Sequence, residues 1–117
     1  MKEFDLKQRT KTFALRIIKL FTSLPKTAEA QVIGKQILRS GTSVGAQYRE
    51  ACRSRSSSEF VSKMQSSLQE LDETAYWLEL LVEGKIVRGE KLAQLRNETE
   101  ELIAIFVSSV KTARSKK

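Results

Sequence analysis

The stretch SGTSVGAQYREA, from Ser40 to Ala51, decides the fold of this 117-residue chain. Serine, threonine and glycine in succession usually mark the end of a helix, yet the apolar rhythm continues through them. Positions three or four residues apart share one face of an α-helix, and here that face carries Ile33, Ile37, Gly41, Val44, Tyr48 and Ala51. The pattern favours one long helix that presents Gly41 and Gly45 to a neighbouring backbone. The alternative is two helices broken at Gly41.

Four stretches with helical spacing fill the chain, and we expect helices at about residues 5–23, 27–53, 57–83 and 90–113. Pro25 separates the first two, and Thr27 is placed to cap the second. Ser56 and Glu59 have the spacing of a capping box before the third. Four amphipathic helices with short connections predict an all-α, antiparallel up-down-up-down four-helix bundle, which forms a single domain over residues 1–117.

The composition argues against catalysis. The chain has no histidine and one cysteine, Cys52, and it lacks phosphate-loop and dinucleotide motifs. We therefore expect no enzymatic activity, no metal and no cofactor; the remaining enzymatic alternative would use Glu50, Glu70 or Glu73. Cys52 falls near the apolar stripe of the long helix, which favours a reduced and inert thiol. With no signal peptide or membrane span at the N-terminus, a cytoplasmic protein is expected.

The net charge of +7 is unevenly distributed along the chain. Residues 1–55 carry twelve Lys/Arg against four Asp/Glu, residues 56–101 carry five against ten, and residues 102–117 carry four against none. Such asymmetry indicates a basic surface that meets an acidic partner.

Two sets of basic residues are candidates for nucleic-acid contact. A ridge on the first helix contains Lys2, Arg9, Arg16, Lys19 and Lys26, and the end of the second helix contributes Arg49, Arg53 and Arg55. No base-reading motif accompanies them, so binding to RNA or DNA would use backbone phosphates. Basic ridges are most often simply solvated. The alternative function is therefore a protein-interaction scaffold that binds no nucleic acid.

If the second and third helices form a hairpin, residues at the same height along the two helices have numbers that sum to about 111. Arg39 then lies level with Asp72 and Glu73, which predicts a structural ion pair. Beside the core stripe of the second helix runs a polar line, and this line is either solvated or a buried hydrogen-bonding seam. It consists of Gln36, Ser40, Ser43, Gln47 and Glu50.

Excess apolar surface predicts self-association. The first helix has a second apolar stripe, and the third is apolar nearly all round near its C-terminal end. The expected contacts with another subunit are Ala14, Ile18, Phe21, Trp77 and Leu80. Deep burial of the first helix within one subunit is the other explanation of its wide apolar arc.

Three segments also carry a family resemblance: LPKTAEAQVIGKQI (24–37), LRSGTSVGAQYREA (38–51) and EFVSKMQSSLQELDETAYWLELL (59–81). They resemble the 23S ribosomal-RNA intervening-sequence proteins, small bacterial four-helix bundles, over roughly residues 4–110. The resemblance implies a homopentameric ring. Relatives of the fold include accessory variability proteins of diversity-generating retroelements, which are basic pentameric partners of a reverse transcriptase. An RNA or RNA–protein partner is therefore implied by the resemblance, whereas the residues themselves supply only charge.

Overall fold

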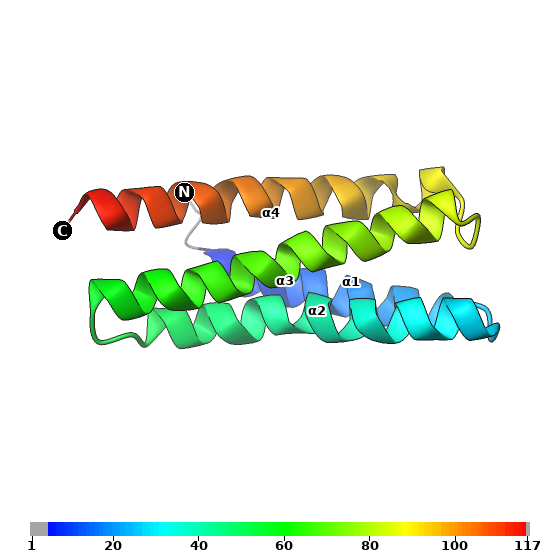
Figure 1. Ribbon diagram of the computed structural model, residues 1–117, viewed down its shortest axis with the longest axis horizontal. Coiled ribbons are helices and arrows are strands. Elements are labelled where there is room, and N and C mark those ends of the chain that lie inside the picture. Colours follow the sequence, from blue (N-terminus) through cyan, green and yellow to red (C-terminus); the bar gives the residue numbers. More distant parts are fainter. Residues whose placement is uncertain (1–4, 117) are drawn as a thin grey trace.

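The computed structural model describes residues 5–116, and these form four long helices in a bundle of 48 × 21 × 20 Å. The helices are α1 (Leu6–Ser23), α2 (Ala28–Cys52), α3 (Ser57–Glu83) and α4 (Gly89–Ser115). They run alternately up and down the long axis, so the α2–α3 turn and the end of α4 lie at the same end of the molecule (Figure 1). The expected helix ranges agree with these bounds to within two residues, and the described part of the chain contains no strand.

Helix α2 runs without interruption through the Ser-Gly-Thr-Ser cluster, which confirms the continuous helix and excludes a break at Gly41. Gly41 is buried against α1, where a Cβ atom built on it would lie 2.7 Å from Cγ1 and 2.9 Å from Cγ2 of Ile17. Gly45 faces Thr10 of α1 in the same way, with 3.0 Å from the built Cβ to Thr10 Oγ1. The absence of side chains at these positions therefore sets how closely α1 packs on α2.

The core forms from one stripe of each helix, as the helical spacing predicts. Its largest fully buried side chains include Phe13 and Ile17 of α1, Ile37 of α2, Leu71 of α3 and Phe106 of α4. Tyr48, from the partly buried edge of the α2 stripe, meets Phe106 edge-on, with 5.7 Å between ring centroids. Burial of these apolar stripes is the main stabilising term, because each large apolar side chain taken out of water contributes about 1.5–3 kcal/mol.

Small hydroxyl side chains interrupt this apolar core where α2 meets α3. The buried hydroxyls of Ser40 and Thr74 are 2.8 Å apart, and the buried Ser67 hydroxyl donates to the carbonyl oxygen of Val44 over 2.7 Å. The polar line on α2 is therefore partly a buried seam and partly solvated. Ser40 belongs to a hydrogen-bonded seam within one subunit, whereas Gln36 and Glu50 are exposed.

Both predicted helix caps are present. Thr27 Oγ1 accepts a hydrogen bond from the amide of Ala30 at 3.4 Å, and Ser56 Oγ accepts one from the amide of Glu59 at 3.1 Å. The Glu59 carboxylate reaches back to the amide of Arg55, one residue before the cap. These bonds satisfy backbone donors that have no partner inside a helix, and they fix where α2 and α3 begin.

The bundle closes unevenly around its four sides. The α1–α2, α2–α3 and α3–α4 pairs pack along their lengths, whereas α1 and α4 meet at few points. The α1–α4 seam is therefore the most open side of the bundle. Over residues 5–116, no helix has the length and apolarity needed to cross a membrane.

Candidate nucleic-acid interface

The basic residues expected to contact nucleic acid do not form one cluster. Arg16 and Lys19 lie midway along α1 and towards its end, and Lys26 lies in the α1–α2 connection. Arg53 and Arg55 lie at the opposite end of the molecule, in the α2–α3 turn, which Figure 1 places far from the α1–α2 connection. Lys2, which continues the ridge in the sequence, lies outside the described residues.

Arg9 has a different role from the one expected. Its guanidinium donates to both carboxylate oxygens of Glu98 at 2.8 and 3.0 Å, and to Glu101 at 2.8 Å, so it joins α1 to α4. The hydrogen bond that Arg9 donates to Glu98 is the main cause of a raised pKa for Arg9, opposed by partial burial. Arg9 is therefore engaged across the open seam and is not a free phosphate ligand. The sequence could not reveal this, because its partners lie about ninety residues away.

Arg16, Lys19 and Lys26 make no ion pair with any residue in the range 5–116. Lys19 and Lys26 are exposed and Arg16 is half-buried. Acidic residues are scarce on α1 and α2, whereas nine of them lie between residues 70 and 101 on α3, α4 and their connection. The ridge on α1 therefore remains open to a polyanion.

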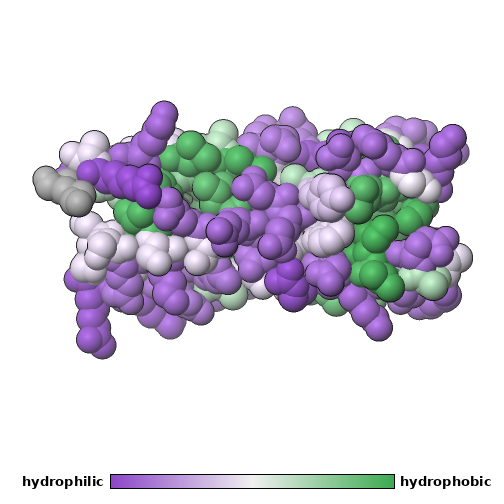
Figure 2. Space-filling view, in the orientation of Figure 1, coloured by the Kyte–Doolittle hydropathy of each residue, from purple (hydrophilic) through white to green (hydrophobic). Residues whose placement is uncertain are grey.

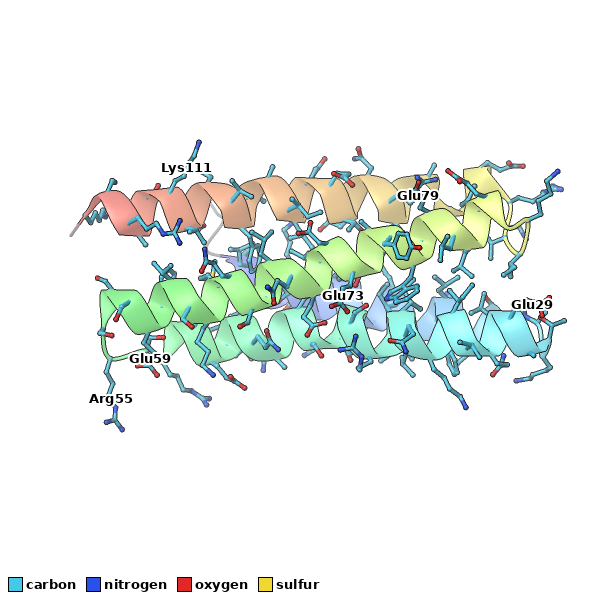
Figure 3. The ribbon with its side chains drawn as sticks, in the orientation of Figure 1. Glu29, Arg55, Glu59, Glu73, Glu79 and Lys111 are labelled. Carbon is cyan, nitrogen blue, oxygen red and sulfur yellow. The ribbon has the colours of Figure 1, made fainter. Side chains whose placement is uncertain are left out.

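The α2–α3 turn carries more acidic neighbours than the sequence indicated. Glu50 accepts a hydrogen bond from Lys63 at 2.8 Å, which raises the pKa of that lysine. A shallow surface hollow is shared by Glu50, Arg53, Arg55, Glu59 and Lys63. Figure 3 shows the Arg55 side chain extending from the turn away from the bundle, with Glu59 nearby on α3. Arg53 and Arg55 are exposed and form no ion pair among the described side chains.

The structure adds basic residues from the C-terminal end of α4. Helix α4 continues to Ser115 and brings Lys111 and Arg114 to the same end as the α2–α3 turn (Figure 1). Lys111 points away from the bundle on the outer side of α4 (Figure 3). Residues 5–14, 42–69 and 102–116 carry ten Lys/Arg and three Asp/Glu, but one of these cations, Arg9, is paired with Glu98 and Glu101 from outside these ranges. We call the half of the bundle formed by these ranges the basic end; the other half carries nine against ten.

The predicted ion pair between Arg39 and Glu73 is present, and Glu70 is its second partner in place of Asp72. Arg39 contacts Glu73 at 2.7 Å and Glu70 at 3.4 Å, while Asp72 points to another part of the surface and takes no part. The hydrogen bond that Arg39 donates to Glu73 raises the pKa of Arg39. Because the Arg39 side chain is 53% exposed, this pair is a surface contact, which contributes little to stability.

The residues expected at a subunit interface differ in exposure. Ile18 is 42% exposed, whereas Ala14, Phe21, Trp77 and Leu80 are half-buried. Phe21 and Trp77 pack against the core of their own subunit, and the Trp77 Nε1 atom is buried without a hydrogen-bond partner in the described region. Three apolar side chains have a larger exposed fraction than Ile18, and none of them was among the expected interface residues: Leu15, Val32 and Tyr76. Figure 2 shows that apolar atoms also gather in two patches on the viewed face, one of them between α3 and α4.

The carboxylates considered for catalysis are occupied by salt bridges. Glu50 pairs with Lys63, and Glu70 and Glu73 pair with Arg39. No group of potential ligands over residues 5–116 has the arrangement needed to hold a metal ion. Cys52 is exposed and not within the apolar stripe, because it follows the buried Ala51 on the turn of helix that faces outward. The arrangement therefore offers charge and hydroxyl groups but no assembled acid–base pair.

The sequence from residue 2 to residue 108 matches the model of the 23S rRNA-intervening sequence protein family. The chain belongs to that family. A solved structure from Bacteroides thetaiotaomicron, described as a protein with unknown function from the S23 ribosomal protein family, is 38% identical. The match covers 90% of this chain and 97% of that protein, with a TM-score of 0.84.

No curated protein matches the sequence. Membership of the 23S rRNA-intervening sequence family and the related structure establish the helical fold. They do not establish a function, because the related structure is itself described as a protein with unknown function. The function has to be argued from this chain's own surface.

Proposed function

We propose that this protein is a non-enzymatic, self-assembling nucleic-acid-binding protein, with RNA as the favoured ligand. The observation that carries the proposal is the basic end, which has ten Lys/Arg and three Asp/Glu and in which only Arg9 and Lys63 form ion pairs among the described side chains. Three of its cations, Arg53, Arg55 and Lys111, are exposed and have no acidic partner among the described side chains. From there Arg16 and Lys19 extend the positive surface along α1. Cations on phosphates release counterions and bind with little regard to sequence.

The preference for RNA is supported by the family name alone, because charge does not distinguish RNA from DNA. Self-assembly is supported by the exposed apolar side chains, such as Ile18 and Tyr76 (53% exposed). In a closed ring the basic end would repeat around the symmetry axis and form a continuous band of charge. We retain the pentamer as part of the proposal because of the resemblance that suggested it.

Salt-titrated binding of single-stranded RNA is the test. We expect micromolar or tighter binding at low salt, with log affinity falling linearly as log salt rises by about 0.7 per neutralised phosphate. Reversing Arg53 and Arg55 to Glu should weaken binding to all sequences alike and flatten this slope. Reversing Arg16 and Lys19 should act in the same direction.

The matched control reverses Lys85 and Lys91, which are exposed cations in the acid-rich half, and makes the same change of net charge. Equal effects of the control and the Arg53/Arg55 variant would show that net charge, and not the basic end, governs binding. Undetectable binding at low salt would reject nucleic-acid binding and leave the protein-interaction scaffold as the function. For self-assembly, sedimentation of Ile18→Glu should show smaller species than the wild type; a monomeric wild type at micromolar concentration would refute it.

A further inference from the structure

A groove of about 1000 Å³ opens at the basic end, between the α2–α3 turn, the start of α3 and the last turns of α4. Its walls carry six hydroxyl side chains, from Ser54, Ser56, Ser57, Ser108, Ser109 and Thr112. We call it the serine groove. It lies outside the α1 ridge and outside the ion pairs described above. It is open to solvent along its length and is not an enclosed cavity.

The hydroxyls of the serine groove are largely unused by the fold. Within residues 5–116, the side chains of Ser57, Ser108 and Ser109 make no hydrogen bond, and the Ser54 Oγ atom is buried without a partner. A buried hydroxyl that lacks a partner costs about 1–3 kcal/mol. These groups are thus available to donate to, or accept from, a polar ligand.

The charges around the groove select for an anion. None of its lining residues is Asp or Glu, while Arg55 and Lys116 both contribute to the lining. The C-terminal ends of α2 and α4 lie here together with the N-terminal end of α3, so two negative helix ends outweigh one positive end and the helix dipoles do not favour an anion. The attraction for an anion therefore comes from the lysine and arginine side chains, together with the hydroxyl donors.

Two apolar side chains, Phe60 and Ile105, also line the groove, and both pack against the core from partly buried positions. A phosphate group makes no favourable contact with an apolar surface, whereas a nucleotide has a flat base, with apolar faces, beside its phosphate. Bases stack on aromatic rings in sequence-tolerant single-strand binding sites. In a duplex the bases face each other and are not available for this contact.

We infer that the serine groove is a subsite for unpaired nucleotides of a single-stranded nucleic acid, with phosphates at the hydroxyls and cations and a base against Phe60. This inference rests on the proposed function and adds a preference for single strands over duplexes. It assigns that preference to residues of α3 and α4 that carry no charge.

Cys52 provides a direct probe of occupancy. It is exposed, lines the groove and is the one cysteine of the chain. The probe ligand is an oligouridine of about ten nucleotides, within the usual site size of single-strand binding folds. At saturation, confirmed by fluorescence anisotropy, it should slow the alkylation of Cys52 by iodoacetamide about fivefold or more, since a stacked strand covers the thiol. An RNA duplex bound at equal occupancy should leave the rate nearly unchanged.

Two variants test the walls. Ser108→Glu places a carboxylate in the groove at an exposed α4 position, and Gln94→Glu makes the same change at an exposed α4 position in the other half. Ser108→Glu should weaken oligouridine binding about tenfold more than Gln94→Glu, because it opposes a phosphate at close range. Phe60→Leu keeps apolar volume but loses the ring, and should weaken single strands several-fold with duplex affinity unchanged. Thermal melts establish that each variant is folded.

The outcomes separate this inference from the proposed function. If oligouridine binds while Cys52 reacts at its free rate, and Ser108→Glu behaves like Gln94→Glu, the groove is not the subsite although nucleic-acid binding stands. If oligouridine does not bind at low salt, the proposed function fails and this inference fails with it. If Cys52 becomes protected as protein concentration rises without RNA, a second copy fills the groove and the inference is overturned.

Discussion

Replacing Gly41 by alanine tests the contact on which the α1–α2 packing depends. The added methyl would lie 2.7 and 2.9 Å from the two γ-carbons of Ile17, and 3.2 Å from its Cβ. These atoms are close to the Ile17 backbone, and the residue is fully buried, so it cannot swing aside. Either α1 moves as a unit or the contact remains strained.

The magnitude follows from two opposed effects. Alanine gains about 0.8–1.0 kcal/mol over glycine inside a helix. Overpacking a filled core costs about 1–3 kcal/mol. We therefore expect Gly41→Ala to lower the free energy of unfolding by about 0–2 kcal/mol, in the upper part of that range because the contact with Ile17 is as short as 2.7 Å. Gly41→Leu should lower it by more, because the longer side chain meets the same Ile17 side chain.

Gly34→Ala is the matched control, since Gly34 is also buried in α2 and gains the same helix propensity. Its built Cβ meets the tip of Leu24, at 2.7 Å from Cδ1, and the ring edge of the half-buried Phe21 at 3.0 Å. These atoms are the far ends of movable side chains near the end of α1, so Gly34→Ala should be close to neutral. Urea unfolding at one fixed protein concentration compares the two variants.

A further variant isolates the steric contact. Ile17→Val removes one of the clashing branches, and in that background Gly41→Ala should cost less than it does in the wild type. This non-additivity is the signature of a direct contact. If Gly41→Ala is as stable as the wild type, or more stable than Gly34→Ala, an added methyl group at position 41 does not disturb the contact with α1. The account of α1–α2 packing would then be wrong.

Two other predictions concern polar contacts. Arg9→Gln should lower the free energy of unfolding by about 1 kcal/mol, because Arg9 donates two hydrogen bonds to Glu98, only 19% exposed, across the least packed seam. This loss should shrink with added salt. Arg39→Gln removes an exposed ion pair and should cost clearly less. Equal losses for Arg9→Gln and Arg39→Gln in thermal unfolding would show that the α1–α4 seam does not depend on Arg9. Thr74→Val should lower the free energy of unfolding by about 1–3 kcal/mol, because the buried Ser40 hydroxyl loses its hydrogen bond with Thr74. Adding Ser40→Ala should recover part of that loss. A double variant that is less stable than both single variants would refute the hydrogen bond's role.

The architecture was accessible from the sequence because it depends on local periodicity. Apolar spacing placed Phe13, Ile37, Leu71 and Phe106 in the core, and short connections required neighbouring helices to be antiparallel. The hairpin register was also accessible. Ser67 bonds Val44, and Arg39 bonds Glu73, with residue numbers that sum to 111 and 112, close to the expected value.

The ion-pair partners were less accessible, because a side chain's partner depends on rotation about the helix axis as well as on level. Asp72 and Glu73 are equally level with Arg39, yet consecutive helical positions are separated by about 100°. Glu73 and Glu70, three residues apart, share the face that meets α2, whereas Asp72 faces the surface shared with Arg96 of α4. A phase argument applied to α3 would have chosen correctly between the two.

The candidate site required the third dimension. Sequence proximity grouped Arg9 with Arg16 and Lys19, but the fold places Arg9 against two carboxylates of α4. The basic end of α4 follows an acidic stretch in the sequence, and only the fold shows what it lies beside. Since α4 runs antiparallel to α3, the acidic part of α4 lies beside the acidic part of α3, and the basic tail reaches the α2–α3 turn. The same topology that pairs the helices therefore separates the charges along the bundle. It also brings the unused hydroxyls of α3 and α4 into a groove that no carboxylate lines, which is why the groove and the basic end coincide.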